Sequence, residues 1–95
     1  MDNFKIINAQ QVIDASEELL QFFTKLNGIA DNLESDKNRI VDSWASETED
    51  KNSYVAGLQK NITNLRALAR GIRECANTSM VYAQRALEAS RNQIN

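Results

Sequence analysis

Few residues in this chain could do chemistry, and their spacing fits no catalytic pattern. Histidine is absent, and Cys75 is the only cysteine among the 95 residues. A Ser–His or Cys–His nucleophile pair is therefore excluded, and so are a Cys/His zinc site and an intrachain disulfide. A lone cysteine on an apolar helix face usually packs rather than reacts. We expect no catalysis, no cofactor and no bound metal.

Two clusters of charge could bind an ion or a partner. The acidic run from Glu47 to Asp50 matches no loop pattern of metal ligands, and we expect it to stabilise the positive end of a helix that begins beside it. Arg66, Arg70 and Arg73 form a basic row at positions i, i+4 and i+7. That row could anchor an acidic partner, although a solvated face, or ion pairs with acids of the chain such as Glu74 and Asp31, is the commoner role.

The composition narrows the class of protein. A net charge of -2 and a pI near 5.0 give no basic footprint for nucleic acid. No stretch approaches the ~20 apolar residues that span a bilayer. Residues 1–7 lack the basic start and the long apolar core of a cleaved signal peptide. We expect the protein to be cytoplasmic, or to leave the cell by a route that reads the folded chain.

Helical signals dominate the chain, which has no proline and three glycines. Asn8, with Gln11 three residues later, predicts a helix N-terminus, and Ser46 with Glu49 predicts a second one. We predict one domain over 1–95: a helix at about 8–42, a turn at about 43–46, a helix at about 47–90 and a frayed tail. A turn this short favours antiparallel helices.

Apolar residues recur every seven positions along both predicted helices, which is typical of coiled-coil packing. A further series, running from Ser16 through Ala30 and Lys37 to Trp44, widens the stripe of the first helix beyond one seam. A two-helix hairpin would leave much of such a stripe exposed, so we predict that it dimerises into a four-helix bundle. The residues expected in the bundle core are Val12, Leu19, Phe22, Phe23, Leu26, Ile29, Leu33, Ile40, Leu58, Ile62, Leu65 and Ile72.

Trp44, the only tryptophan, lies at the predicted turn in the sequence Trp44-Ala45-Ser46. Aromatic residues at a bundle end often serve packing, and Trp44 could plug the open end. Alternatively, the turn is a recognition motif for a partner. The sequence leaves both interpretations open.

With its length, its two long helices and its Trp-centred turn, the chain resembles the WXG (ESAT-like) family of small helical hairpins from bacterial type VII secretion. Trp44 matches the tryptophan of the family's Trp-x-Gly motif, and Ser46 stands where the family has glycine. The family's C-terminal signal, Tyr-x-x-x-Asp/Glu, is incomplete. Tyr82 could be its remnant, but Ala86 stands where the acid belongs.

The resemblance implies a non-enzymatic, virulence-associated binding protein that is secreted or co-secreted without a cleaved signal peptide. Its expected partners are a second copy of itself or a related hairpin, and the secretion ATPase. The missing acid favours a partner that carries the signal. One alternative is an adaptor or chaperone that pairs with the helical leader of a larger type VII toxin. Another is a structural coiled-coil protein.

Overall fold

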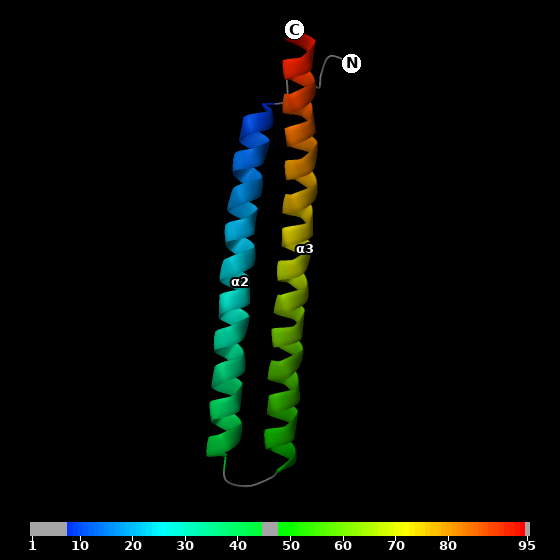
Figure 1. Cartoon of the computed structure of the whole chain (residues 1–95). Helices are drawn as coiled ribbons and strands as arrows, with labels where there is room; N and C mark the ends of the chain where they lie inside the picture. The colour runs from blue at the N-terminus through cyan, green and yellow to red at the C-terminus, as the bar shows by residue number, and fades with distance from the viewer. Residues whose placement is uncertain (1–7, 45–47, 95) are drawn as a thin grey trace.

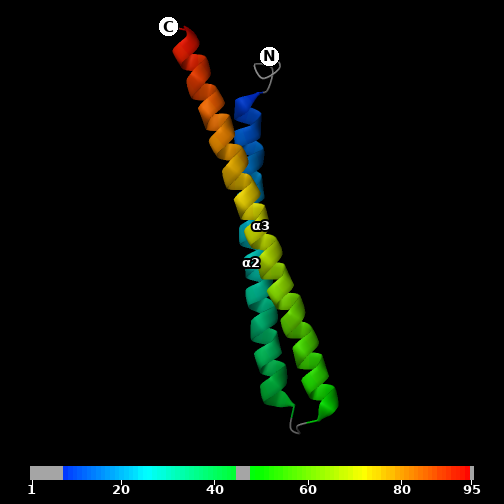
Figure 2. The ribbon, with the colours of Figure 1, turned by 90° about the vertical axis from the view of Figure 1, so that its right-hand side faces the viewer.

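Two long antiparallel helices make up the fold. The computed structural model describes residues 8–44 and 48–94, with side chains up to residue 91. Helix α2 spans Ala9–Ser43 and helix α3 spans Glu49–Ile94, side by side in a hairpin of 73 × 19 × 14 Å (Figure 1). The predicted all-α class with two long helices is confirmed. Seen a quarter turn away, α3 crosses α2 at a shallow angle (Figure 2).

Side-chain caps define where each helix begins. The Gln11 amide donates to Asn8 Oδ1 at 3.1 Å, which confirms Asn8 as the N-cap of α2. At α3, the Lys51 amide donates to Thr48 Oγ1 at 3.1 Å, so Thr48 is the cap. The sequence had pointed to Ser46, which lies outside the described residues. Helix α3 begins two residues after its predicted start and continues to Ile94, past the predicted end.

The first turn of α3 is tied to the last turn of α2. Trp44 leaves the helix with an extended backbone, and its amide donates to the Ile40 carbonyl at 2.9 Å. The Lys51 ammonium lies 3.4 Å from the Trp44 carbonyl oxygen. A positive charge at this place stabilises the negative end of the α2 dipole. This contact holds the two helix ends together across residues 45–47.

Small side chains occupy the centre of the seam between the helices. Ser16 and Ala30 are buried on α2, and on α3 the buried residues other than Lys51 are Ile62, Ala69, Ala76 and Ala83. The Ser16–Trp44 series, which the sequence predicted only to widen the apolar stripe of α2, therefore lies at the middle of the hairpin seam. Small residues let two backbones approach closely, and only a narrow strip of each helix is then covered by the other.

Most residues predicted for the bundle core border this seam instead of filling it. Ile62 is buried, whereas Phe22 and Ile29 are 46% and 49% exposed. The remaining members of the predicted set are half-buried. Two helices cannot enclose so wide a stripe, because each offers the other a single line of contact. Apart from Ile62, the predicted core residues keep exposed surface in the hairpin.

Polar contacts fix the register of the two helices. The hydroxyls of Ser16 and Ser79 are 2.5 Å apart inside the seam, and the Ser16 hydroxyl is also 2.7 Å from the Val12 carbonyl oxygen. Nearer the turn, the Lys37 ammonium donates to Gln59 Oε1 at 2.6 Å. With Ser16 beside Ser79, the last turns of α3 extend past the start of α2 (Figure 1).

Candidate functional site

The hairpin has two unlike faces on either side of its seam. Successive residues of a helix turn by about 100°, so a residue just before a seam position lies on one flank and a residue just after it lies on the other. Phe22 precedes Phe23 on α2, and Leu68 precedes Ala69 on α3. Because the helices run in opposite directions, their preceding residues fall on the same face. Asp31, which follows Ala30, lies on the opposite face.

The face that contains the preceding residues is apolar. Phe22, Ile29, Leu68 and Tyr82 on it are 46%, 49%, 55% and 66% exposed. Half-buried side chains join these exposed rows to the seam. They are Leu19, Leu26, Leu33, Leu58, Leu65 and Ile72. We call this surface the apolar face, and it contains most of the residues predicted for the bundle core.

The size of the apolar face suits a protein partner. It extends from Val12 to Ile40 along α2, about 42 Å at about 1.5 Å per residue. With the 19 Å width of the hairpin, it offers up to roughly 800 Å², which is what one side of a standard protein–protein interface buries.

The opposite face is polar and contains the principal ion-pair network. The Arg66 guanidinium binds Asp31 Oδ1 at 2.9 Å and Glu34 Oε1 at 3.0 Å, and the Lys37 ammonium lies 3.4 Å from Glu34 Oε2. The pairing of the arginine row with Asp31 is thus confirmed for Arg66. Farther along the row, Arg73 lies over the Phe23 ring at 5.1 Å from its centroid. These contacts give Arg66 and Arg73 a role within the hairpin.

These contacts also shift the titration of the charged groups. Hydrogen bonds, first from Arg66 and then from Lys37, hold the pKa of the Glu34 carboxyl below its ordinary value of 4.5. Reciprocally, Glu34 and then Asp31 raise the pKa of Arg66. All these groups are at the surface, so their effect on stability is reduced by solvent screening.

We predict an acid-sensitive contribution from Glu34. Because its folded pKa is depressed, the stabilisation is present above about pH 4.5 and is lost as the pH falls through the lower folded pKa. Denaturant unfolding at fixed protein concentration should show a smaller loss of stability, between about pH 5 and pH 3, in Glu34→Gln than in the unchanged chain. Equal losses in the two proteins would contradict this role.

Trp44 lies where α2 ends, in contact with the start of α3. Its ring centroid is 6.2 Å from that of Tyr54, with an angle of 52° between the planes. The indole is half-buried, and with Arg39, Ile40 and Ser43 it lines a shallow hollow. Trp44 therefore packs against the hairpin and keeps an accessible side. Ala45 and Ser46, the rest of the predicted turn motif, lie outside the described residues.

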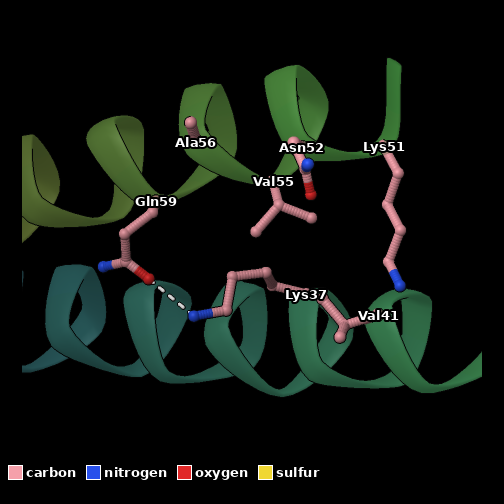
Figure 3. A pocket seen from close by; sticks show the side chains of 7 residues that line it. All are labelled: Lys37, Val41, Lys51, Asn52, Val55, Ala56 and Gln59. Atoms are coloured by element: carbon pink, nitrogen blue, oxygen red, sulfur yellow. Dashed lines mark hydrogen bonds between the residues drawn. The ribbon is translucent and has the colours of Figure 1, made fainter. Parts of the chain in front are cut away.

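A second hollow lies near the turn, between α2 and α3, and is shown in Figure 3. Its walls include Val41, Val55 and two lysines, Lys37 from the Ser16–Trp44 series and Lys51, which the sequence did not point to. The Lys37 ammonium binds Gln59, and the Lys51 ammonium binds the Trp44 carbonyl oxygen. Both groups thus bind oxygens of the hairpin itself, and they connect α2 and Trp44 to α3 near this end of the molecule. The position of Lys37 in the Ser16–Trp44 series was the signal that indicates its place at the seam.

Two further residues were singled out from the sequence. Tyr82 is 66% exposed on the apolar face. Cys75 is also exposed, so the expectation that it packs within the chain is wrong for the hairpin alone. It precedes Ala76 and therefore lies on the apolar face, where only a partner could cover it.

Within residues 8–44 and 48–94, no group of His, Cys, Asp and Glu side chains could hold a metal ion. No helix in that described part combines the length and the apolar character needed to cross a membrane. Comparison of the chain with protein-family models, curated proteins and solved structures gave no match.

Proposed function

We propose that this chain is a non-enzymatic binding protein of a bacterial type VII secretion system, and that it acts as a dimer through its apolar face. The observation that carries the proposal is the exposure of Phe22, Ile29 and Leu68 on one side of a helical hairpin. A hairpin of this kind is compatible with the WXG resemblance. Its turn also contains Trp44, the residue on which that resemblance is centred.

A second helical hairpin is the partner whose shape fits this face. Two hairpins placed face to face form a four-helix bundle, in which the large side chains of both apolar faces become the core. Leu26, Leu33 and Leu65 border the seam already and would lie near the middle of that bundle. Burying them removes the exposed patch that a single hairpin leaves.

The turn end of the hairpin would then be presented to the secretion ATPase. Trp44 combines a packed side against Tyr54 with a side that lines an open hollow. Large aromatic residues that are partly accessible often anchor protein partners. This arrangement is compatible with recognition of the folded hairpin during export.

An adaptor role is the second candidate. Tyr82 is exposed but is followed at the fourth position by Ala86, also exposed, in place of an acid. A protein that lacks the complete signal could travel with a chain that supplies it, such as the helical leader of a larger toxin. The apolar face would then bind that leader. A purely structural coiled-coil protein would use the same face without any export.

Mass measurement tests the proposal. We expect sedimentation equilibrium at micromolar concentration to give an assembly, either of the purified chain alone or after mixing with a hairpin or toxin leader encoded by a neighbouring gene. Export of the chain in its native host should depend on the secretion ATPase. A stable helical monomer that binds none of these partners would refute the dimer. Export that is unaffected by loss of the ATPase would refute the secretion role.

We predict that Trp44→Ala affects export more than stability. The capping contacts of Thr48 and Lys51 remain, so the variant should stay helical and assembled. Its melting temperature should fall less than that of Leu26→Ala, the control for loss of a large apolar side chain. Export, or binding of the ATPase, should decrease. If Trp44→Ala collapses the bundle, or if export is unchanged, Trp44 serves packing alone.

A further inference from the structure

Helix α3 has two exposed series of residues with heptad spacing that α2 does not cover. One heptad series runs from Tyr54 to Tyr82 and another from Gly57 to Arg85, with alternating spacings of three and four residues. Every residue of both series is exposed. Arg85, at the end, is the only charged member. We call these two series the α3 strip, and it forms the outer part of the apolar face.

Two glycines lie within the α3 strip for no reason that the hairpin itself supplies. Glycine in a helix interior is less stable than alanine. Neither Gly57 nor Gly71 has a positive φ, and a Cβ added at either would meet no atom within 4 Å. Alanine would therefore fit at both places in a single chain. The glycines leave two depressions in the strip, and Leu68 and Tyr82 protrude from it.

The protrusions and depressions of the strip are related by a two-fold axis. A point between Ala69 and Arg70 is midway between Leu68 and Gly71, and it is also midway between Gly57 and Tyr82. In an antiparallel pair of α3 helices with the axis at that point, Leu68 faces Gly71 of the second copy. Tyr82 then faces Gly57 of the second copy. Each large side chain therefore meets a residue that has none.

We propose that the partner of the apolar face is a second copy of this chain, packed with α3 antiparallel to α3 about an axis between Ala69 and Arg70. This inference rests on the proposed function and names its partner. The same axis brings the guanidinium of Arg85 to the Tyr54 ring of the other copy, where a cation–π contact can form.

The remaining residues of the strip also match under this symmetry. Asn61 meets Thr78, which joins two polar side chains, and Asn64 meets Cys75, which is exposed in the single hairpin. Along the outer border of the strip, the charged residues are Lys60 and Glu74. An antiparallel pair brings these opposite charges to the same side of the seam, which favours this orientation.

Other registers lose the match. A shift of one heptad in either direction places Leu68 against Asn64 or Thr78 and leaves Gly71 without a large side chain opposite. A parallel pairing sets Leu68 beside Leu68 of the second copy and Gly71 beside Gly71 of the second copy. The two leucines then crowd each other, and the two glycines leave a gap at the next level. Size complementarity thus selects one antiparallel register.

The outer strip of α3 is covered in this interface, whereas the outer strip of α2 lies at its rim. The corresponding strip of α2 contains Phe22 and Ile29 but also four charged residues. They are Glu18, Lys25, Asp36 and Arg39. Charged residues are depleted at the core of protein interfaces and are common at the rim.

In such a homodimer neither copy has an acid four residues after Tyr82, so the Trp44 turn or a third chain would direct export.

Cysteine cross-linking of the full-length chain tests the register. In the proposed pair, position 64 lies beside Cys75 of the second copy, within the separation that a disulfide spans. Asn64→Cys should therefore form a covalent dimer under mild oxidation. Three controls should form little of it. Gly71→Cys would meet Cys75 only in a register shifted by one heptad, Thr63→Cys lies on the polar face, and Asn64→Cys with Cys75→Ser lacks the second thiol.

A second pair of variants tests the glycine contact. Gly71→Leu should raise the dimer dissociation constant at least about tenfold, because the added side chain collides with Leu68 of the second copy. Gly28→Leu is the matched control, since its Cβ also meets nothing within 4 Å but position 28 lies away from the apolar face. It should leave the dissociation constant within about twofold.

The outcomes separate this inference from the proposed function. If the chain sediments as a dimer but Asn64→Cys cross-links no better than Thr63→Cys, this register is wrong and the binding role stands. If the chain alone is monomeric and pairs with a different hairpin, the second-copy inference falls and the binding role again stands. If it assembles with nothing, both fall.

Discussion

Replacing Leu65 with aspartate should convert the assembly into monomers or unfold it. Leu65 is half-buried between the hairpin seam and the exposed row that contains Leu68. In a four-helix bundle it would be enclosed by apolar side chains, where an unpaired carboxylate is strongly unfavourable. Sedimentation at micromolar concentration should show loss of the dimer, and circular dichroism should show less helix or a much lower melting temperature.

The matched control is Thr63→Asp, which adds the same charge to an exposed position on the polar face. It should remain assembled and change the free energy of unfolding by no more than about 0.5 kcal/mol. Leu26→Asp tests the same face from α2 and should behave like Leu65→Asp. If Leu65→Asp associates as tightly as the unchanged chain, the apolar face is not the interface.

The helices could be predicted from the sequence because local signals specify them. The absence of proline and the heptad spacing favour two long helices, and Asn8 caps α2 as expected. The second boundary was harder, because Ser46 and Thr48 are both good caps and lie close together. The structure describes only Thr48, and its hydroxyl accepts the Lys51 amide.

Hydrophobicity alone could not show which apolar series is buried between the two helices. Leu26 and Leu33 are larger and more apolar than Ala30, yet Ala30 is fully buried and the leucines are half-buried. The angle at which two helices meet decides which series faces the neighbour, and small residues are favoured where backbones approach most closely. Periodicity identifies a stripe, but it does not separate the part that α3 covers from the part left for a partner.

The sequence pointed to the large apolar residues of the candidate site, and its polar supports were missed. Phe22 and Ile29 were predicted in a bundle core, and both are exposed in the hairpin. Lys51 was not expected at the seam, because the charge of a lysine usually keeps its side chain at the surface. Lys51 is only 6% exposed, since its stem crosses the seam and its ammonium reaches a carbonyl at the end of α2.

Ile62→Ala should be the most damaging neutral substitution in the hairpin itself. Ile62 has 0% exposure and is the largest fully buried side chain in the described part of the chain. Its neighbours along the α3 seam, Ala69 and Ala76, are too small to fill the space that its loss would leave. We expect the free energy of unfolding to fall by about 2–4 kcal/mol, which corresponds to a drop of roughly 10–25 °C in melting temperature for a domain of this size.

Ile72→Ala is the matched control, because it removes the same atoms from a half-buried position on the border of the apolar face. Its effect should depend on concentration. In a dilute sample, where dimers dissociate, the loss should be well below that of Ile62→Ala, and it should increase as protein concentration rises and the face becomes covered. The loss at Ile62 should change much less with concentration, because α2 covers this side chain within one chain. Equal losses at both positions in dilute samples would mean that the seam does not run through Ile62.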